Sequence, residues 1–137
     1  MKIYTTSRED YLKAIYVLQR RNLEVHSVDV ARYLGFSKPS VSNAVSRLTN
    51  EGFLYMDSDN ALKLTDKGRE VAEKTYERHC FFSKYLIRLG VEPATAMEDA
   101  CRMEHAISDE SFEKLKAALG QADDVEDSPE EGLKLCL

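Results

Sequence analysis

Apolar residues recur every three or four positions along most of the chain, which is the period of an amphipathic α-helix. Residues 7–21 show this period clearly, because Tyr11, Leu12, Ile15 and Leu18 fall on one helical face. Five further segments follow the same period: residues 27–35, 37–52, 65–90, 92–108 and 108–120. The chain is therefore predicted to be mostly α-helical.

The residues that flank these segments favour helix starts and stops. Hydroxyl residues stand at five starts, where their oxygens can cap exposed N–H groups: Ser7, Ser27, Ser37, Thr65 and Ser108. Glycines follow four segments, where a left-handed backbone ends a helix: Gly35, Gly52, Gly90 and Gly120. Pro39 and Pro93 lie near helix starts, where a missing N–H costs little.

Residues 53–65 depart from the helical period. Two short strand-like runs flank the sequence DSDN at 57–60, and Asp and Asn are typical of hairpin turns. Three helices, a short turn between the second and the third, and then a two-stranded ribbon predict a winged helix-turn-helix over residues 1–70. Residues 123–137 are rich in Asp and Glu and are predicted to form an acidic tail with at most one helical turn.

The formal charge of −5 argues against a nucleic-acid partner only until its distribution is considered. Residues 1–70 hold 11 Lys and Arg against 9 Asp and Glu, a net charge of +2. Residues 71–137 hold the other 8 of the 19 basic residues and 15 of the 24 acidic residues, a net charge of −7. We therefore expect the first part to approach a polyanion and the second part to attract cations.

An α-helix fits the major groove of duplex DNA, where residues near its N-terminus meet the base edges. The polar face of the predicted recognition helix (37–52) and the wing carry the candidate contacts, namely Ser37, Lys38, Pro39, Ser40, Ser42, Asn43, Arg47 and, on the wing, Lys63. Asn43 could read a base edge, whereas Lys38 and Arg47 suit phosphates. A solvated polar face would look the same in this helix alone, but the preceding helix and the following hairpin favour binding to double-stranded DNA. Because residues 1–70 are only weakly basic, we expect a homodimer in which two modest DNA-contacting surfaces act together. Its affinity for DNA should depend strongly on salt concentration.

Hydrophobic residues make up 43% of the 137 residues, enough for one domain or two small ones. The three cysteines (Cys80, Cys101 and Cys136) form an odd set without the spacing of a disulfide framework. Residues 1–10 lack the apolar stretch of a signal peptide, and no apolar run approaches the roughly 18 residues of a membrane span. We expect a cytoplasmic protein with reduced thiols and no membrane partner.

Cys101, Glu104 and His105 have the spacing i, i+3 and i+4, which places them on one face of a helix. A thiolate, a carboxylate and an imidazole are all ligands of transition metals. The alternative is that Cys101 fills a small core position, His105 is a hydrogen-bonded neighbour and Glu104 is exposed, and the spacing alone favours this alternative. Of the other histidines, His26 is expected in a surface loop and His79 at the border of the core.

Five segments within residues 5–120 stand out by their order and spacing: SREDYLKAIYVL, SKPSVSNAVSRLTNEGFL, LTDKGREVA, RHCFFSKYLIRLGV and DACRMEHAIS. Together they resemble the diphtheria toxin repressor family, and the chain length resembles its short manganese-transport-regulator branch. The resemblance implies a homodimeric, metal-activated repressor of manganese or iron homeostasis genes. It implies a winged helix-turn-helix over residues 1–70, a helical metal-binding and dimerisation domain over residues 71–122, and a metal site at their junction. We expect the dimer interface near residues 81–89 and 94–107.

Under this resemblance, the first metal position of the manganese branch maps onto Asp10, Glu104 and His105. Cys101 falls where that branch has a carboxylate and where the iron branch has a cysteine. His79 matches a histidine of the second, ancillary metal position. Asp10 has a further possible role, because it could simply cap the first helix.

Two residues depart from the family pattern. Lys13 stands where the manganese branch has a second-position carboxylate, and Ser83 stands where the iron branch has another carboxylate. A protonated lysine cannot ligate a metal and repels a nearby dication. We therefore expect one divalent metal per subunit, Mn(II) or Fe(II), with Lys13 paired with acidic groups such as Asp10 or Glu104. A Cys101 thiolate would favour Fe(II), Co(II) or Zn(II) over Mn(II).

A dication bound by both Asp10 in the DNA-binding part and Glu104 in the dimerising part would join the two parts. In a dimer this would fix the separation and tilt of the two recognition helices, so that both half-sites of an operator are reached at once. No small organic substrate is expected. One alternative is a winged-helix regulator whose metal site is vestigial, which Lys13 favours. Another is a small metalloenzyme that activates water. The sequence contains no Gly-rich phosphate loop, nucleophile elbow or HExxH motif, so we expect no enzymatic activity.

Overall fold

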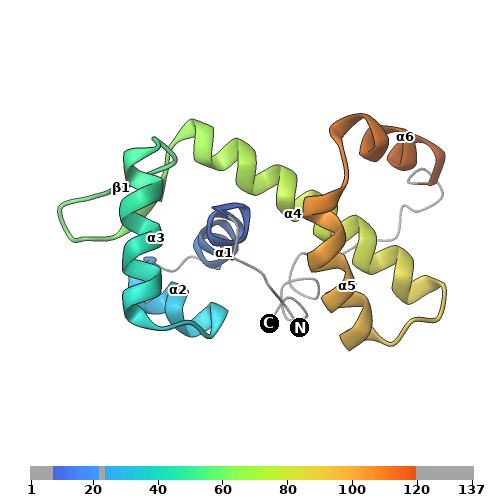
Figure 1. The fold of residues 1–137 in the computed structure, drawn as a ribbon, viewed down its shortest axis with the longest axis horizontal. Coiled ribbons are helices and arrows are strands. Elements are labelled where there is room, and N and C mark those ends of the chain that lie inside the picture. The colour runs from blue at the N-terminus through green and yellow to red at the C-terminus, as the bar shows by residue number, and fades with distance from the viewer. Residues whose placement is uncertain (1–7, 22–23, 120–137) are drawn as a thin grey trace. The chain divides into compact units, whose positions relative to one another are not determined.

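The structure is a computed structural model that describes residues 8–21 and 24–119. This part of the chain contains six helices and one two-stranded antiparallel sheet, so the predicted fold class is confirmed. The chain divides into two compact units, Met1–Lys74 and Thr75–Leu137, and the boundary falls within one long helix (Figure 1). No helix in the described residues is long and apolar enough to span a membrane.

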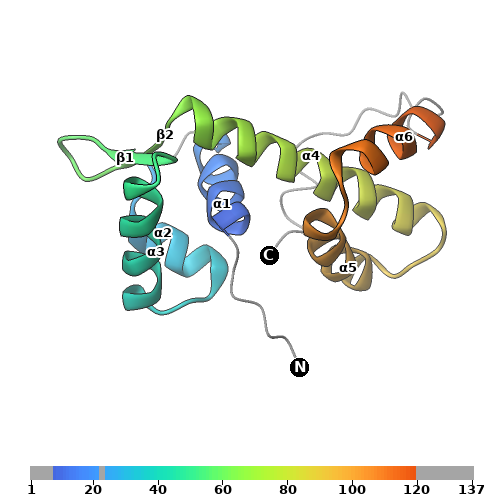
Figure 2. The same ribbon diagram turned by 45° about the horizontal axis from the view of Figure 1, so that its top comes forward.

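The first unit consists of three helices followed by a hairpin. Its elements are α1 (Arg8–Arg20), α2 (Ser27–Leu34), α3 (Lys38–Asn50), β1 (Leu54–Met56), β2 (Leu62–Leu64) and the first turns of α4 (Asp66–Arg88). The strands pair antiparallel, with Tyr55 opposite Lys63. Figure 2 shows the hairpin projecting beyond the end of α3, as expected of a wing.

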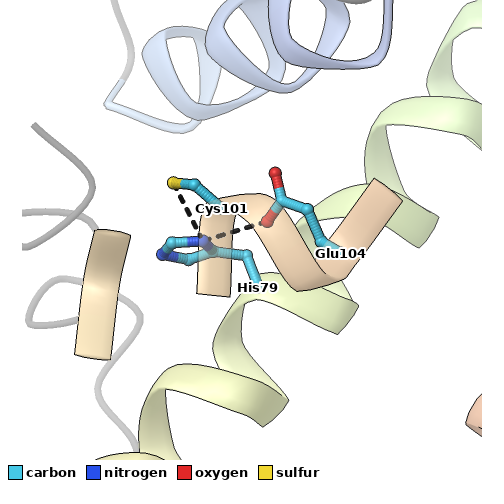
Figure 3. Close-up of side chains that lie close together, drawn as sticks. All are labelled: His79, Cys101 and Glu104. Atoms are coloured by element: carbon cyan, nitrogen blue, oxygen red, sulfur yellow. Dashed lines mark hydrogen bonds and ion pairs between the residues drawn. The ribbon is translucent and has the colours of Figure 1, made fainter. Parts of the chain in front are cut away.

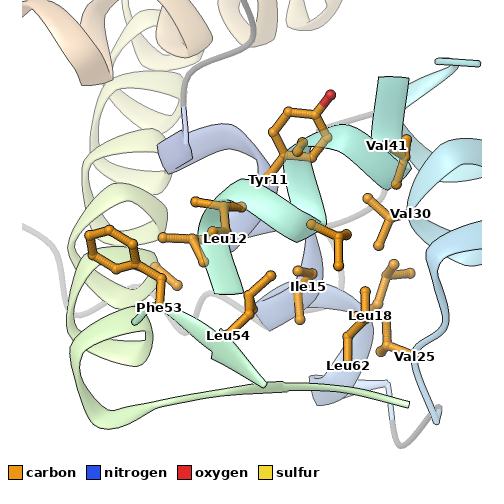
Figure 4. Close-up of a cluster of buried hydrophobic side chains, with 14 of the residues drawn as sticks. Tyr11, Leu12, Ile15, Leu18, Val25, Val30, Val41, Phe53, Leu54 and Leu62 are labelled. Atoms are coloured by element: carbon orange, nitrogen blue, oxygen red, sulfur yellow. The ribbon is translucent and has the colours of Figure 1, made fainter. Parts of the chain in front are cut away.

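A single apolar core holds the first unit together (Figure 4). The face of α1 predicted from the 3–4 period is buried, and Leu12 and Ile15 are fully inaccessible to solvent. Its other fully buried members include Val25, Val30, Val41, Leu48, Leu54 and Leu62. Each such side chain contributes about 1.5–3 kcal/mol through removal from water. The core fixes α3 against α1 and leaves the polar face of α3 outside.

The ends of the described helices follow the predicted signals in most cases. Ser37 accepts a hydrogen bond from the backbone N–H of Ser40 (3.3 Å) and caps α3. Gly35 ends α2 with a φ of 72°, a left-handed conformation that glycine adopts without strain. Ser108 accepts a hydrogen bond from the N–H of Ser111 (3.1 Å) at the start of the sixth helix.

The prediction that Ser27 caps α2 is wrong. Ser27 is the first helical residue, and His26 is the N-cap. The backbone N–H of His26 donates to Oδ2 of Asp29 (2.8 Å). Asp29 is the third helical residue, so its carboxylate satisfies the N–H of the N-cap, as in a capping box. Ser7, Gly120, Cys136 and the predicted tail at 123–137 lie outside the described residues.

The start of α4 is fixed to the hairpin at Gly68. A Cβ atom at this position would lie 2.1 Å from the carbonyl oxygen of Phe53, so only glycine allows the backbones to approach this closely. Thr65 supports the same junction, because its hydroxyl accepts from the N–H of Gly68 (3.1 Å) and donates to the carbonyl of Gly52 (2.7 Å). Gly68 therefore has a packing role within a helix that it would otherwise weaken.

Asp57 organises the turn of the wing. Its carboxylate accepts hydrogen bonds from the N–H groups of Asp59 (2.9 Å) and Ala61 (3.0 Å). The bond from Ala61 is the main reason why the pKa of Asp57 lies below its usual value. Asn60 adopts a left-handed conformation with a φ of 61°. The hairpin turn predicted from DSDN is thus confirmed, with the chemistry expected of Asp and Asn.

The second unit contains the C-terminal part of α4, α5 (Pro93–Ala106) and α6 (Asp109–Leu119). Phe82, Ala100 and Phe112 form its small core, against which Phe81 packs. The ring of Phe81 meets that of Phe112 edge-on at 5.4 Å. Part of the apolar stripe at 81–89 is therefore used inside the protomer, whereas Leu89 at its end is 78% exposed.

Candidate metal centre and nucleic-acid interface

Helices α4 and α5 bring His79, Cys101 and Glu104 together inside the second unit (Figure 3). The Nδ1 atom of His79 lies 3.0 Å from Oε2 of Glu104 and 3.6 Å from Sγ of Cys101. The His79 and Glu104 side chains are completely buried, and Cys101 is half-buried. One residue from α4 thus meets two residues that are one turn apart on α5.

Glu104 lies between two histidines. Oε2 faces His79, and Oε1 lies 3.2 Å from Nε2 of His105, whose side chain is 22% exposed. The alternative in which Glu104 is exposed is therefore wrong, because the side chain has no solvent-accessible surface. A buried carboxylate is costly without partners, and two imidazoles supply them here. The two oxygens of Glu104 face different histidines, which is the arrangement of a carboxylate that can bridge two metal positions.

The chemistry of these donors fits a divalent transition metal. Imidazole nitrogen, thiolate sulfur and carboxylate oxygen bind such ions at about 2.0–2.3 Å, so ligands in one tetrahedral shell lie about 3.3–3.8 Å apart. The donor atoms of His79, Cys101 and Glu104 all lie within 4.8 Å of one another. Nε2 of His79 is buried and has no hydrogen-bond partner within the described residues, so the imidazole is held by its Nδ1 side alone.

The other residues predicted for the metal site have different positions. Asp10 is half-buried in the first turn of α1 and belongs to the first unit, so its role as a ligand stays a prediction. Lys13 is buried, with 5% of its surface exposed. The Ser83 hydroxyl donates to the carbonyl of His79 (2.8 Å), one turn earlier in α4, and is therefore occupied by its own helix. No disulfide joins Cys80 and Cys101.

The residues predicted to contact DNA lie on the outer face of α3 and on the wing. Every predicted contact on α3 and its cap is exposed, which applies to Ser37, Lys38, Pro39, Ser40, Ser42, Asn43 and Arg47. Lys63 on β2 is partly exposed. The Ser37 hydroxyl also donates to Oγ of Ser40 (2.8 Å), so the two hydroxyls stabilise the start of α3.

Tyr55 is an exposed wing residue that the sequence interpretation did not include. It is 50% exposed and pairs across the sheet with Lys63, so both side chains lie on the same face of the hairpin. The signal was its place next to Leu54, because neighbouring side chains of a strand point to opposite faces and Leu54 is buried. An aromatic ring beside a lysine is suited to the sugar and phosphate surface of a nucleic acid.

Tyr11 connects α1 with the helix-turn-helix. It is buried, and its ring lies 6.1 Å from that of Phe36 in the turn between α2 and α3. Burial raises the pKa of the Tyr11 hydroxyl, the charge of Arg47 on α3 opposes that shift, and neighbouring Asp10 adds to it. The first turn of α1 is thus in electrostatic contact with the recognition helix inside a single unit.

Comparison with known proteins agrees with these features. The family model of the iron dependent repressor N-terminal DNA binding domain matches residues 4–62, and that of the iron dependent repressor metal binding and dimerisation domain matches residues 65–130. The chain is 35% identical over 108 residues to the transcriptional regulator MntR of Escherichia coli O157:H7, covering 79% of this chain and 70% of that protein.

Two longer proteins are also similar. The diphtheria toxin repressor of Corynebacterium glutamicum is 32% identical over 130 residues, covering 94% of this chain and 56% of that protein. The solved structure of the manganese regulator SloR matches with a TM-score of 0.77 and 31% identity, covering 85% of this chain and 55% of that one. The chain spans little more than half the length of these two relatives.

A winged helix-turn-helix joined to a helical unit in which side chains that could hold a metal are clustered fits the class of metal-dependent transcriptional regulators. The chain belongs to the diphtheria toxin repressor family, within an MntR-like branch. The family consists of transcriptional repressors with DNA-binding and dimerisation domains, so the metalloenzyme alternative is set aside. A divalent metal, duplex DNA and a second copy of the chain are the partners this membership supports.

Proposed function

We propose that this protein is a divalent-metal-activated repressor that binds its operator as a homodimer and controls manganese or iron homeostasis genes. The observation that carries the proposal is the buried contact of His79 with Glu104 and Cys101. Three metal-binding groups of different chemistry converge there from two helices, with ligand atoms 3.0 and 3.6 Å apart. Residues 1–70 would bind DNA, and residues 71–122 would bind the metal and dimerise.

The proposed metal site takes Glu104 and His105 from α5 and Asp10 from α1, with Cys101 beside them and His79 on the buried side of Glu104. We propose one metal per subunit. Lys13 supports this stoichiometry. It is a buried residue, and under the family resemblance it stands where the manganese branch has a carboxylate of the second metal position, so its charge would repel a second dication there. The Cys101 thiol faces His79, so its sulfur is available as a ligand and favours Fe(II) over Mn(II).

The proposed activation is electrostatic. Asp10 and Glu104 carry like charges, and a dication that binds both neutralises their repulsion. Such a bond would fix the two parts of each subunit and hence the separation of the two recognition helices in the dimer. Tyr11 supports a direct effect on the helix-turn-helix, since it follows Asp10 in α1 and packs near Phe36. Leu89 and the helix at 94–107 are proposed for the dimer contact.

The proposal is tested by selecting operators from a pool of random duplexes with the reduced protein under anaerobic conditions. The expected result with Mn(II) or Fe(II) is a two-fold symmetric sequence whose half-sites lie about one helical turn apart, bound by a dimer in sedimentation experiments. With a chelator, no sequence should be enriched. Enrichment of the same sequence in chelator would favour the alternative with a vestigial metal site, and no enrichment in either condition would refute the proposal.

A further inference from the structure

Arg78 connects α4 to the end of α5 and to the start of α6. It is buried, with 9% of its surface exposed. Its Nη1 donates to the backbone carbonyl of Ile107 (2.7 Å), and its Nη2 donates to Oδ1 of Asp109. The guanidinium also lies over the ring of Phe112, 5.2 Å from the ring centre. One side chain thus contacts the C-cap of α5 and two residues in the first turns of α6.

These contacts lie next to the metal-binding side chains. Ile107 is the C-cap of α5, so its carbonyl is among the groups that the helix itself leaves without a partner. The cation of Arg78 also complements the negative end of the α5 dipole. Glu104 and His105 occupy the last turn of α5, immediately before Ile107. Arg78 and His79 are neighbours in α4, and each contacts this last turn or its cap.

We propose that Arg78 is a positioning residue for the metal centre. It holds the last turn of α5 against α4, so that Glu104 and His105 are in place before the metal binds. The inference rests on the proposed function, because it takes these two side chains as ligands. Residues that orient metal ligands in this way typically change metal affinity by about 10–100-fold when they are replaced.

The surroundings of Arg78 separate this role from a general contribution to stability. The Asp109 side chain is 66% exposed, so loss of Arg78 would leave its carboxylate in water rather than buried and unpaired. Nε of Arg78 is itself buried without a partner in the described part of the chain. Arg78→Met therefore leaves no buried unpaired charge, which is what makes loss of one partner of a buried ion pair so destabilising.

The test uses the full chain, reduced and free of oxygen, with Co(II) as the probe because its absorption reports a thiolate ligand. In Arg78→Met, the Kd for Co(II) is expected to rise at least about tenfold. The control is Lys116→Met, which removes a cation that pairs with Glu77 and joins α6 to α4 without touching α5. This control should keep the wild-type Kd, and thermal unfolding of both variants records how much stability each loses.

A second variant covers the case in which Arg78→Met does not fold. Arg78→Lys keeps a cation near Phe112 but lacks the fork that reaches both Ile107 and Asp109, so its Kd should lie between those of wild type and Arg78→Met. A Kd within about twofold of wild type in Arg78→Met, or in Arg78→Lys where Arg78→Met does not fold, would overturn the inference alone, as would an equal loss of affinity in Lys116→Met. If wild type binds no Co(II), the proposed function fails and takes the inference with it.

Discussion

The Nδ1 atom of His79 lies 3.0 Å from Oε2 of Glu104, and neither side chain is exposed to solvent. An ionised carboxylate only accepts hydrogen bonds, so an ionised Glu104 pairs with the tautomer of His79 that carries its proton on Nδ1. A buried polar pair of this kind costs free energy to desolvate and is weak evidence for a purely structural role. The His79–Glu104 pair is more easily explained as part of a metal site, in which a cation joins or replaces the proton that the two side chains share.

Glu104→Gln should preserve the shape of this buried contact but remove the charge that attracts a cation. We expect the Kd for Mn(II) or Co(II), measured by anaerobic titration, to rise more than about tenfold, since loss of a ligand should cost at least as much as loss of an outer partner. Glu98→Gln is the matched control, because Glu98 is on the same helix but pairs with Arg102 at the surface. Equal affinities in both variants would show that Glu104 is not a ligand.

Cys101 should set the preference among metals. In Cys101→Ser the ratio of Co(II) to Mn(II) affinity should fall, because a hydroxyl is a harder and weaker ligand than a thiolate. The thiolate-to-Co(II) absorption band should disappear in Cys101→Ser and persist in Cys80→Ser, which removes the other cysteine of the described residues. A band that survives in Cys101→Ser would mean that sulfur does not bind the metal through this residue.

Lys13 should limit each subunit to one metal. Wild type is expected to bind one tight equivalent of metal per chain. Lys13→Glu is expected to bind two, because the substitution replaces a cation that repels the second metal with a carboxylate that can bind it. Lys13→Met separates the two effects, because it removes the charge without supplying a carboxylate and should remain at one. Two tight equivalents in the wild-type protein would contradict this prediction.

Asn43 and Arg47 on the exposed face of α3 should affect DNA binding differently. Asn43→Ala should cost about 1–3 kcal/mol and relax specificity at one base pair, as expected for loss of a base contact. Arg47→Ala should weaken binding to all sequences and lower the salt dependence by about one ion per site. Binding to operator variants over a series of salt concentrations distinguishes these effects, with Arg102→Ala on α5 as a charge control.

Much of the fold was predictable because its information is local. The 3–4 period of α1 fixed its buried face, and the Asp and Asn residues at 57–60 fixed the hairpin turn. His26 was missed as the cap of α2, because a carboxylate at Asp29 can replace the usual hydroxyl and the sequence alone does not choose between them. The need for glycine at position 68 could not be predicted, because the close approach of the Phe53 carbonyl depends on tertiary structure.

The candidate site divides in the same way. The spacing of Cys101 and Glu104 placed them on one face of a helix, which is a local property. The spacing could not show that Glu104 is buried against His79, because that contact joins α5 to a different helix. Arg78 carried no signal of its own, since an arginine beside a histidine in a polar helix normally lies at the surface.

The central claim is that metal occupancy sets the affinity for DNA. The most direct measurement is the Kd of the reduced dimer for its selected operator, by fluorescence anisotropy, with saturating Mn(II) or Fe(II) and with excess chelator. Coupling of about 1–3 kcal/mol predicts binding about 5–150-fold tighter with metal. A Kd that is the same with metal and with chelator would contradict the account.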